Sequence, residues 1–295
     1  EEAGQEGVER TSRGRARYDI SSTLAQVAEP ATLGPLAGLA ALLACLLPVL
    51  LGFVVPILHL VLLATSSDAF VADRRFLGDA LNSLMLAAAA AAIIVALAVF
   101  LAYAGRLSRQ RSVARLVEFS TLGYAIPGAV IAVGIVLPLA GADHALDWLS
   151  RGLLGVPAAP VLGGTALALL LAYTVRFLAV GLGNVSPGLA AIDPAMDDGA
   201  RILGASPRQV LRRIHLPLLR GPALTAGLLA FVEVMKELPA TLQIRPFNLD
   251  TLAIGVYRFA SDERLAQAAV GALVIVLVSL APVIVLSRTI ARSRR

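Results

Sequence analysis

Residues 82–104 read "NSLMLAAAAAAIIVALAVFLAYA", a stretch without a single charged side chain. A helix needs about 20 apolar residues to cross the hydrocarbon core of a bilayer, which is about 30 Å thick. The whole chain of 295 residues is 58% hydrophobic and only 15% charged, which is more apolar than an ordinary soluble domain. The sequence therefore predicts an integral membrane protein. Its alanine-rich run, Ala87 to Ala92, has side chains small enough for close helix packing.

Five further long apolar stretches lie before and after residues 82–104. We expect six membrane spans, approximately 36–64, 80–104, 119–140, 161–183, 222–242 and 266–287. The fold class is then an all-α membrane protein with six transmembrane helices. Pro48 and Pro56 predict a kink in the first span. The predicted organisation is a polar segment 1–34, a six-span domain 35–288 with a polar loop 184–221, and a basic tail 289–295.

Arginine is distributed unevenly between the loops on the two sides of the membrane. If the N-terminus is cytoplasmic, the cytoplasmic side receives seventeen arginines and the opposite side receives six. Basic residues concentrate in cytoplasmic loops, so this asymmetry predicts that both termini and the loop 184–221 are cytoplasmic. The single cysteine, Cys45, lies inside an apolar run, which excludes a disulfide framework and a cysteine metal site.

The polar loop contains the sequence "DDGARILGASPRQVLRRIHLPLL" at 197–219. Asp193–Pro194 predicts a helix start, with an acidic cap and proline in the first turn. Gly204 predicts a left-handed helix stop, Ser206–Pro207 predicts a second helix start, and Leu216–Pro217 predicts the end of that helix. Met196, Ala200 and Leu203 form an apolar stripe on the first helix.

Three interpretations of this helix–turn–helix segment compete. It could be a solvated connector between spans, or a docking element for a cytoplasmic partner. It could also be a DNA-binding unit, because "ARILGASPRQVLRRI" at 200–214 has the spacing of a helix-turn-helix. The spans at both ends hold the segment close to the membrane, which opposes entry into a major groove.

The docking interpretation is favoured because the segment resembles the EAA motif of permease subunits in binding-protein-dependent ABC importers. That motif is Glu-Ala-Ala, a glycine, and then Ile-x-Leu-Pro at fixed spacing. The matching residues are Asp198, Gly199 and Ala200, then Gly204, and finally Ile214, Leu216 and Pro217. The departures are Asp for Glu and Gly for Ala. The resemblance implies that the helix 194–204 binds a groove of a separate ATP-binding subunit and transmits its closure to the spans.

Three other stretches are similar to the same family. "NSLMLAAAAAA" from Asn82 resembles the start of its transmembrane core, and "LGYAIPGAVIAVGIV" from Leu122 resembles the next core span, with a helix break at Pro127 and Gly128. "MKELPATLQIRPF" from Met235 resembles the ferric-iron branch. Together these resemblances imply a type I ABC importer permease (MetI-like) architecture with a cytoplasmic coupling helix. The implied cargo is ferric iron. Thiamine, polyamine, phosphonate and sulfate importers share the core, so these cargoes stay open.

The resemblance also implies the partners and the location. The implied partners are a dimer of ABC ATP-binding subunits, a periplasmic or lipid-anchored substrate-binding protein, a second permease half or copy, and membrane lipid. The implied location is the inner membrane of a bacterium. We expect that this chain is not an enzyme and binds no cofactor, because the partner ATPase would use the ATP and Mg. We also expect that it binds no nucleic acid. "ERTSRGRARY" from Glu9 resembles the link before the second half of a two-repeat permease. We therefore expect a C-terminal half, with a half-size subunit that pairs with its own copy as the alternative.

Charged residues within the predicted spans are costly and therefore informative. Glu233, Lys236 and Glu237 lie in the fifth span and Arg176 lies in the fourth. Helical spacing places Glu233 on one face with Lys236 and with Glu237, and Pro239 would break the helix just beyond them. They are candidates for the translocation path. The alternative is that they orient the helix near the outer interface.

The sequence contains no pattern typical of catalytic or metal chemistry. His59, His144 and His215 are scattered and are expected at the surface or at helix boundaries. Two carboxylates do not make a metal site, and the glycine-rich stretches lack the lysine of a phosphate-binding loop. The rivals to an ABC permease are an ion-coupled secondary transporter, which should show inverted repeats, and a membrane-tethered DNA-binding regulator. Co-purification with an ATPase separates the permease from both.

The arginine asymmetry makes a testable prediction about topology. In a Cys45→Ser background, single cysteines are introduced at Ser108, Ser150 and Ser206. A membrane-impermeant thiol reagent applied to intact cells should label only the position 150 variant, because the other two positions face the cytoplasm. Labelling of position 108 or 206 would contradict the orientation.

Overall fold

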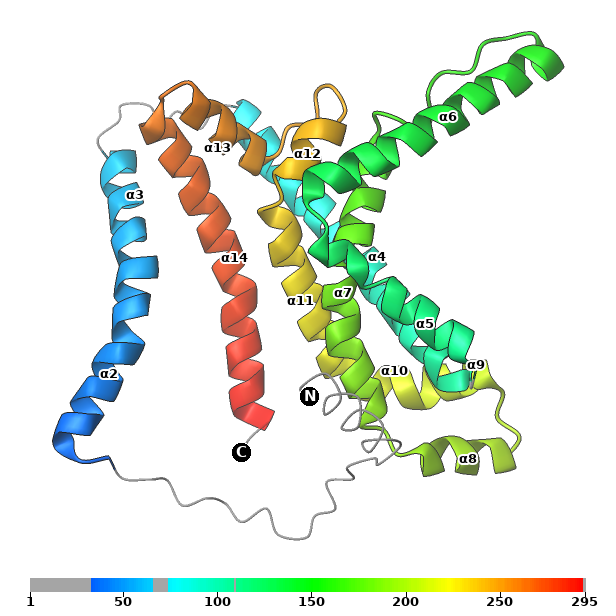
Figure 1. The fold of residues 1–295 in the computed structure, drawn as a ribbon, viewed down its shortest axis with the longest axis horizontal. Helices are drawn as coiled ribbons and strands as arrows, with labels where there is room; N and C mark the ends of the chain where they lie inside the picture. The colour runs from blue at the N-terminus through cyan, green and yellow to red at the C-terminus, as the bar shows by residue number, and fades with distance from the viewer. Residues whose placement is uncertain (1–32, 66–73, 109, 294–295) are drawn as a thin grey trace, which may run out of the picture. The chain divides into compact units, whose positions relative to one another are not determined.

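The computed structural model describes residues 33–65, 74–108 and 110–293, and every element in these ranges is helical (Figure 1). Most of the predicted N-terminal segment, with its four arginines, and the last two residues of the basic tail lie outside the described residues. The elements are α2 Pro35–Val49, η1 Leu50–Val54, α3 Val55–Thr65, α4 Arg74–Leu107, α5 Arg111–Phe119, η2 Leu122–Ala125, α6 Gly128–Leu154, α7 Ala166–Ala190, α8 Pro194–Ile202, α9 Pro207–Val210, η3 Leu211–His215, α10 Leu216–Leu218, α11 Arg220–Met235, α12 Pro239–Ile244, α13 Leu252–Ser261 and α14 Leu265–Ser293.

The first predicted span is one helical stretch, Pro35–Thr65. Between Pro48 and Pro56 it contains the π-helical turn η1, in which Val55 N donates to Leu50 O. A proline lacks the N–H that the ordinary ladder requires, and a widened turn is a common way to accommodate the gap. None of the residues of α2, η1 or α3 is buried.

Beyond this first span, the core of the protein is formed by α4, α7 and α11, which pack against one another. Five of the eleven buried residues of α4 are alanines, and large side chains of α7 are buried opposite them. Small side chains allow helix axes to approach closely, which is how membrane helices associate without a hydrophobic driving force. The fully or almost fully buried members include Ala87, Ala90, Ile94 and Ala98 of α4, Leu169, Tyr173 and Phe177 of α7, and Ala226 and Ala230 of α11.

Five described helices are long and apolar enough to cross a membrane, and the number is six when Pro207–Leu218 and Arg220–Met235 are taken as one span bent by 72°. The prediction of six spans is confirmed in this form, but two boundaries are wrong. The stretch 119–140 is broken between Phe119 and Gly128, and its helix α6 continues to Leu154. The stretch 222–242 is broken after Met235, and α12 begins at Pro239.

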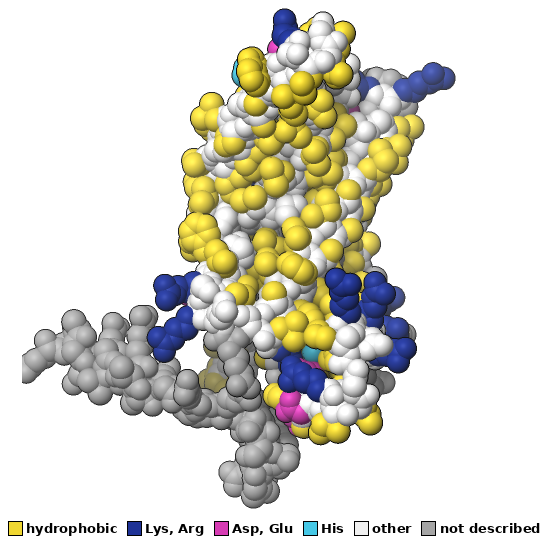
Figure 2. Space-filling model, turned by 90° about the vertical axis from the view of Figure 1, so that its right-hand side faces the viewer, with side chains coloured by type: hydrophobic (Ala, Val, Ile, Leu, Met, Phe, Trp, Pro, Cys, Tyr) yellow, Lys and Arg dark blue, Asp and Glu magenta, His cyan; other side chains and the backbone are white. Residues whose placement is uncertain are grey.

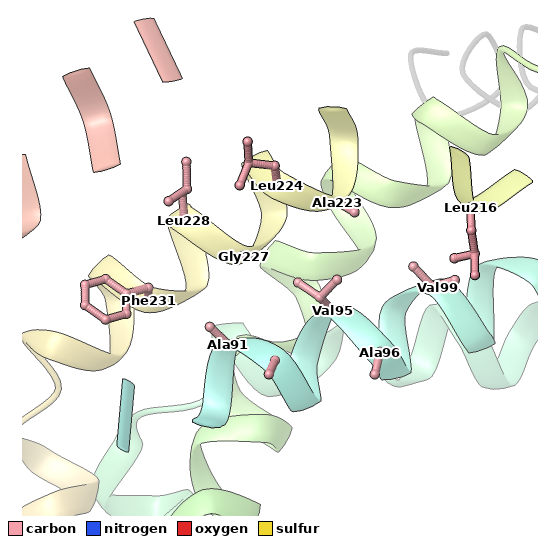
Figure 3. A pocket seen from close by; sticks show the side chains of 11 residues that line it. Ala91, Val95, Ala96, Val99, Leu216, Ala223, Leu224, Gly227, Leu228 and Phe231 are labelled. Carbon is pink, nitrogen blue, oxygen red and sulfur yellow. The ribbon is translucent and has the colours of Figure 1, made fainter. Parts of the chain in front are cut away.

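Large hydrophobic side chains remain exposed along the helices, as expected for a surface that faces lipid or another subunit. On the face shown in Figure 2 they cover the middle, and arginines gather towards the two ends. An apolar groove of about 520 Å³ lies between α4 and α10–α11, and Leu216 points into it towards α4 (Figure 3). No residue that lines this groove is charged.

One carboxylate at the end of the core opposite α8–α10 holds the start of α13 in place. Asp250 forms ion pairs with Arg75 of α4 (3.1 Å), with Arg258 of α13 (3.1 Å) and with Arg245. Its backbone carbonyl accepts a hydrogen bond from Asn82 Nδ2 at 3.0 Å. Burial alone would raise the pKa of Asp250, but the hydrogen bond with Arg75 and the positive charges of Arg245 and Arg258 outweigh it and hold the pKa below its ordinary value.

This cluster predicts a pH-dependent contribution to stability. Because the pKa of Asp250 is lowered by folding, its contribution is complete above the ordinary carboxyl value of 3.8 and is lost as the pH falls through the native pKa. Asp250→Asn should lower the free energy of unfolding by about 1–2 kcal/mol near neutral pH, since its arginines are partly exposed. The control is Asp262→Asn, at the exposed C-terminal end of the same helix. Thermal unfolding in detergent that is equal for the two variants would contradict the prediction.

Candidate functional site

The polar segment forms two short helices joined by a glycine turn, as the sequence predicts. α8 begins at Pro194, and Asp193 Oδ1 caps it by accepting from Ala195 N at 2.8 Å. Gly204 follows the helix with a φ of +77°, a conformation that a side chain resists. Two turn hydrogen bonds close the helix end, from Gly204 N to Arg201 O and from Ala205 N to Ala200 O.

The second helix starts where the sequence predicts and ends one residue beyond the predicted stop. Ser206 and Gln209 form a capping box before α9, each side chain binding the backbone N–H of the other residue. The helical stretch ends at Leu218, one residue beyond the predicted end at Leu216–Pro217, and α11 continues after a bend of 72°. The π-helical turn η3 immediately precedes the proline. The hydrogen-bond ladder therefore changes register just where the proline N–H is missing.

The residues that match the EAA motif lie in three consecutive parts of this segment. Asp198, Gly199 and Ala200 lie on α8, where Asp198 is exposed and pairs with Arg201 at 3.0 Å. Gly204 forms the turn between the helices. Ile214, Leu216 and Pro217 lie on the helical stretch that leads into α11. The motif thus provides a short helix that extends away from the core and its connection to a span.

Apolar side chains at the end of α8 are strongly exposed. Ile202 is 86% exposed and Leu203 is 87% exposed, while Met196 is 44% exposed. The predicted stripe included Met196 and Leu203 but missed Ile202. These side chains lie among charged residues, away from the apolar middle of the spans, and are therefore candidates for a partner surface.

The opposite side of α8 is fixed to the core by a buried carboxylate that the sequence analysis did not single out. Asp197 accepts from Arg106 Nε at 2.8 Å, and its other oxygen lies 2.7 Å from His215 Nε2. The Asp197 side chain is 9% exposed and His215 is completely buried. His215 is therefore not at the surface, and of the two expected positions it occupies the helix boundary, between η3 and α10. We call Arg106, Asp197 and His215 the loop anchor.

The loop anchor joins four elements. Arg106, at the end of α4, also donates to the carbonyls of Leu189 (2.6 Å) and Ile192 (2.9 Å) at the C-terminal end of α7. A positive charge is favourable there because the last carbonyls of a helix lack partners. Tyr103 of α4 packs edge-on against the His215 ring and donates to Pro207 O at 2.7 Å. Displacement of α8 therefore acts on α4, on α7 and on the helix after Ser206.

The anchor also changes the acidity of its carboxyl group. Burial would raise the pKa of Asp197, but hydrogen bonds from Arg106 and His215 outweigh this effect and hold the pKa below its ordinary value. Asp197 is therefore ionised at neutral pH. Its negative charge lies near the N-terminal end of α8, where the helix dipole favours it.

The charged residues of the predicted fifth span separate into two unlike pairs. Lys236 Nζ lies 2.9 Å from Glu233 Oε1, and both side chains are partly exposed. Glu237 does not share this face, because α11 ends at Met235 and the chain turns before α12. The expected i,i+4 relation between Glu233 and Glu237 is therefore wrong.

Glu237 instead lies buried beside Arg176 of α7. Its Oε2 is 3.4 Å from Arg176 Nε, and its Oε1 accepts from Ala240 N at 3.1 Å. Thr241 donates to the Glu237 carbonyl at 2.7 Å. Because the Thr241 hydroxyl proton is used there, Tyr173 donates to Thr241 Oγ1 across their 2.6 Å contact. These bonds attach the start of α12 to α7.

Gly128, the first residue of α6, packs directly on this ion pair. A Cβ atom at this position would lie 2.1 Å from Arg176 Nη1 and 2.6 Å from Glu237 Oε1, so only glycine allows the approach. The helix break predicted at Pro127 and Gly128 thus meets the break before Pro239 at one charged pair. No group of three His, Cys, Asp or Glu side chains within the described ranges is placed to bind a metal ion.

Comparisons with known proteins agree with this geometry. The family of binding-protein-dependent transport system inner membrane components matches residues 94–295. The Fe(3+)-transport system permease protein FbpB 2 of Haemophilus influenzae is 26% identical over 235 residues, which are 80% of this chain and 43% of that protein. The putative 2-aminoethylphosphonate transport system permease protein PhnV of Salmonella typhimurium is 34% identical over 131 residues, 44% of this chain and 49% of that protein.

A similar fold is present in a solved structure. A chain of a bacterial ABC transporter that imports the acidic polysaccharide alginate superimposes with a TM-score of 0.66 at 16% identity, over 86% of this chain and 94% of that one. Our chain spans less than half of the length of the two curated relatives. Since the family matches more than half of the chain, this protein belongs to the inner membrane components of binding-protein-dependent transport systems.

Proposed function

We propose that this chain is a permease half of an ATP-driven importer and that α8 binds a separate ATP-binding subunit. The observation that carries the proposal is the two-sided character of α8. Its exposed end presents Ile202 and Leu203, and its opposite side is fixed to α4 and α7 through Asp197. A connector that is only solvated needs neither feature.

The loop anchor supplies the mechanical step. When ATP-binding subunits close, they would displace α8, and the buried Asp197 would carry the displacement to Arg106 and His215. Arg106 also binds the end of α7, so α4 and α7 would move together. Packed elements with ion-paired contacts respond in discrete steps, as alternating access requires. ATP and Mg would act in the partner subunits.

The remaining assignments belong to the same proposal. The termini and the segment α8–α10 face the cytoplasm of a bacterium, as the arginine asymmetry predicts. A second permease half or a second copy completes the path, and a binding protein delivers the cargo from outside. The similarity to FbpB 2 supports ferric iron as cargo, and the higher local identity with PhnV supports 2-aminoethylphosphonate.

The docking role predicts the effect of a charge at the exposed end of α8. Leu203→Asp should abolish co-purification with the ATP-binding subunits and abolish uptake, because it places a charge in an apolar contact. It should leave membrane abundance unchanged, since Leu203 is 87% exposed. Leu203→Met is the matched control and should retain both properties. Normal co-purification of Leu203→Asp would refute the role of α8.

The loop anchor predicts a different defect. Asp197→Asn leaves Arg106 with a weaker acceptor in a largely buried site, and should lower the free energy of unfolding by about 1–3 kcal/mol. It should retain the ATP-binding subunits while reducing uptake per ATP hydrolysed. The neighbouring Asp198→Asn changes only an exposed pair and should be nearly neutral in stability, at about 0–1 kcal/mol. Equal unfolding temperatures and equal coupling for the two variants would contradict the anchor.

A further inference from the structure

Arg176 is a charged side chain whose hydrogen-bonding capacity is largely unused. It lies in the middle of α7, a helix with a mean hydropathy of 1.9 over its most apolar window. Its Nε and Nη1 atoms are buried and have no hydrogen-bond partner among the described residues. The 3.4 Å approach of Glu237 is an ion pair of poor hydrogen-bond geometry. Buried donors without acceptors are costly, so this arrangement requires an explanation.

Glu237 does not satisfy the hydrogen-bond donors of Arg176, because its carboxylate is also bonded to the start of α12. Its Oε1 accepts from Ala240 N at the start of α12, and Gly128 packs against both charged groups. The guanidinium therefore has an acceptor nearby but lacks the two parallel hydrogen bonds that arginine forms with a well-placed oxyanion. Its side chain is 21% exposed, so the group is not sealed from the surface.

The surroundings of Arg176 are better suited to a site for a transported ligand than to a purely structural ion pair. Two discontinuous stretches, η2–α6 and α11–α12, meet at Arg176. Transporters place substrate sites at such breaks, where freed backbone groups meet a charged ligand. The apolar groove beside α4 has no charged lining residue, so it supplies nothing to recognise a charged solute. The pair Lys236–Glu233 is more exposed and is already bonded at 2.9 Å.

We propose that Arg176 is an anion-binding group of the transport path, that Glu237 is its resident counter-ion, and that the cargo is a small oxyanion of the phosphonate or phosphate type. This proposal rests on the proposed importer function and specifies its substrate class. A planar guanidinium matches the geometry of phosphonate oxygens. The incoming anion would replace Glu237 at Arg176, while the negative charge of Glu237 would favour release of the anion once the path opens.

The first test is uptake by the complete transporter in proteoliposomes. Radiolabelled 2-aminoethylphosphonate, inorganic phosphate and ferric iron are supplied separately with the binding protein. We expect uptake of a phosphonate or phosphate, reduced about tenfold or more in Arg176→Gln and reduced less in Arg176→Lys, which keeps the charge but loses the planar fork. Arg151→Gln is the matched control, because it removes an arginine from an exposed ion pair far along α6. Uptake of ferric iron alone, or normal oxyanion uptake by Arg176→Gln, would overturn the proposal.

The second test measures the local charge and does not depend on transport. Tyr124 is 51% exposed and packs edge-on against Phe177, whose ring lies 5.5 Å from the Arg176 guanidinium carbon. In a Cys45→Ser background, Tyr124→Cys is treated with an anionic and a cationic methanethiosulfonate reagent. The ratio of the anionic to the cationic rate should fall about threefold or more when Arg176→Gln is added, and rise with Glu237→Gln.

The two tests separate the possible failures. A reagent ratio that does not respond to Arg176→Gln would overturn the anion site, yet leave the importer and its α8 docking surface intact. Loss of docking would instead appear in the Leu203→Asp variant. If the Arg176–Glu237 pair were only structural, both single variants would lower the folded fraction, and oxyanion uptake per folded transporter would stay normal in Arg176→Gln.

Discussion

The contact between Asp197 and Arg106 is the constraint on which the cytoplasmic end of the molecule depends. A carboxylate this buried must be paired, and the pairing fixes where α8 lies relative to α4. The Arg106 guanidinium also binds the carbonyls at the C-terminal end of α7. The other oxygen of Asp197 is bonded to His215, which lies just before α10. Because Arg106 and Asp197 each bond to more than one segment, one segment cannot shift without breaking these bonds or carrying the others. The exposed end of α8 is free of this constraint and remains open to a partner.

The helices in the interior of the protein are held together in a different way. Alanine contacts bring α4, α7 and α11 close together, and three charged clusters lie where helices begin, end or break, although Arg176 itself comes from the middle of α7. Asp250 organises one end, the loop anchor the other, and Arg176 with Glu237 marks the two breaks between them. The first two sites have closely bonded partners. In the third, Nε and Nη1 of the charged Arg176 side chain are buried without hydrogen-bond partners, whereas in the loop anchor the charged groups are bonded and His215 Nδ1 is the unpartnered atom.

Much of this organisation is predictable from sequence because its signals are local. Apolar run length indicates the spans, and Asp193–Pro194, Gly204 and Ser206–Pro207 indicate the two short helices correctly. The failures concern relations between distant residues. Nothing in the spacing of Arg106, Asp197 and His215 indicates that they meet, and His215 looks like one of three scattered histidines. Helical spacing also misassigned Glu237, because the helix ends at Met235 before the i,i+4 relation can form. The stop signal at Pro217 acts one residue later, at Leu218, because the π-helical turn before the proline changes the hydrogen-bond register.

The position of Arg176 has a consequence for biosynthesis. The chain is made from its N-terminus, so α7 leaves the ribosome before Glu237 exists. An arginine at the centre of a span costs about 2.5–3.5 kcal/mol during insertion by the translocon, and the mean hydropathy of α7 is 1.9 compared with 2.9 for α4. The helix that packs most closely with the rest of the core is therefore a less favourable one to insert. We therefore expect its retention in the bilayer to depend on α4, which is already made and offers its row of alanines before the carboxylate partner arrives.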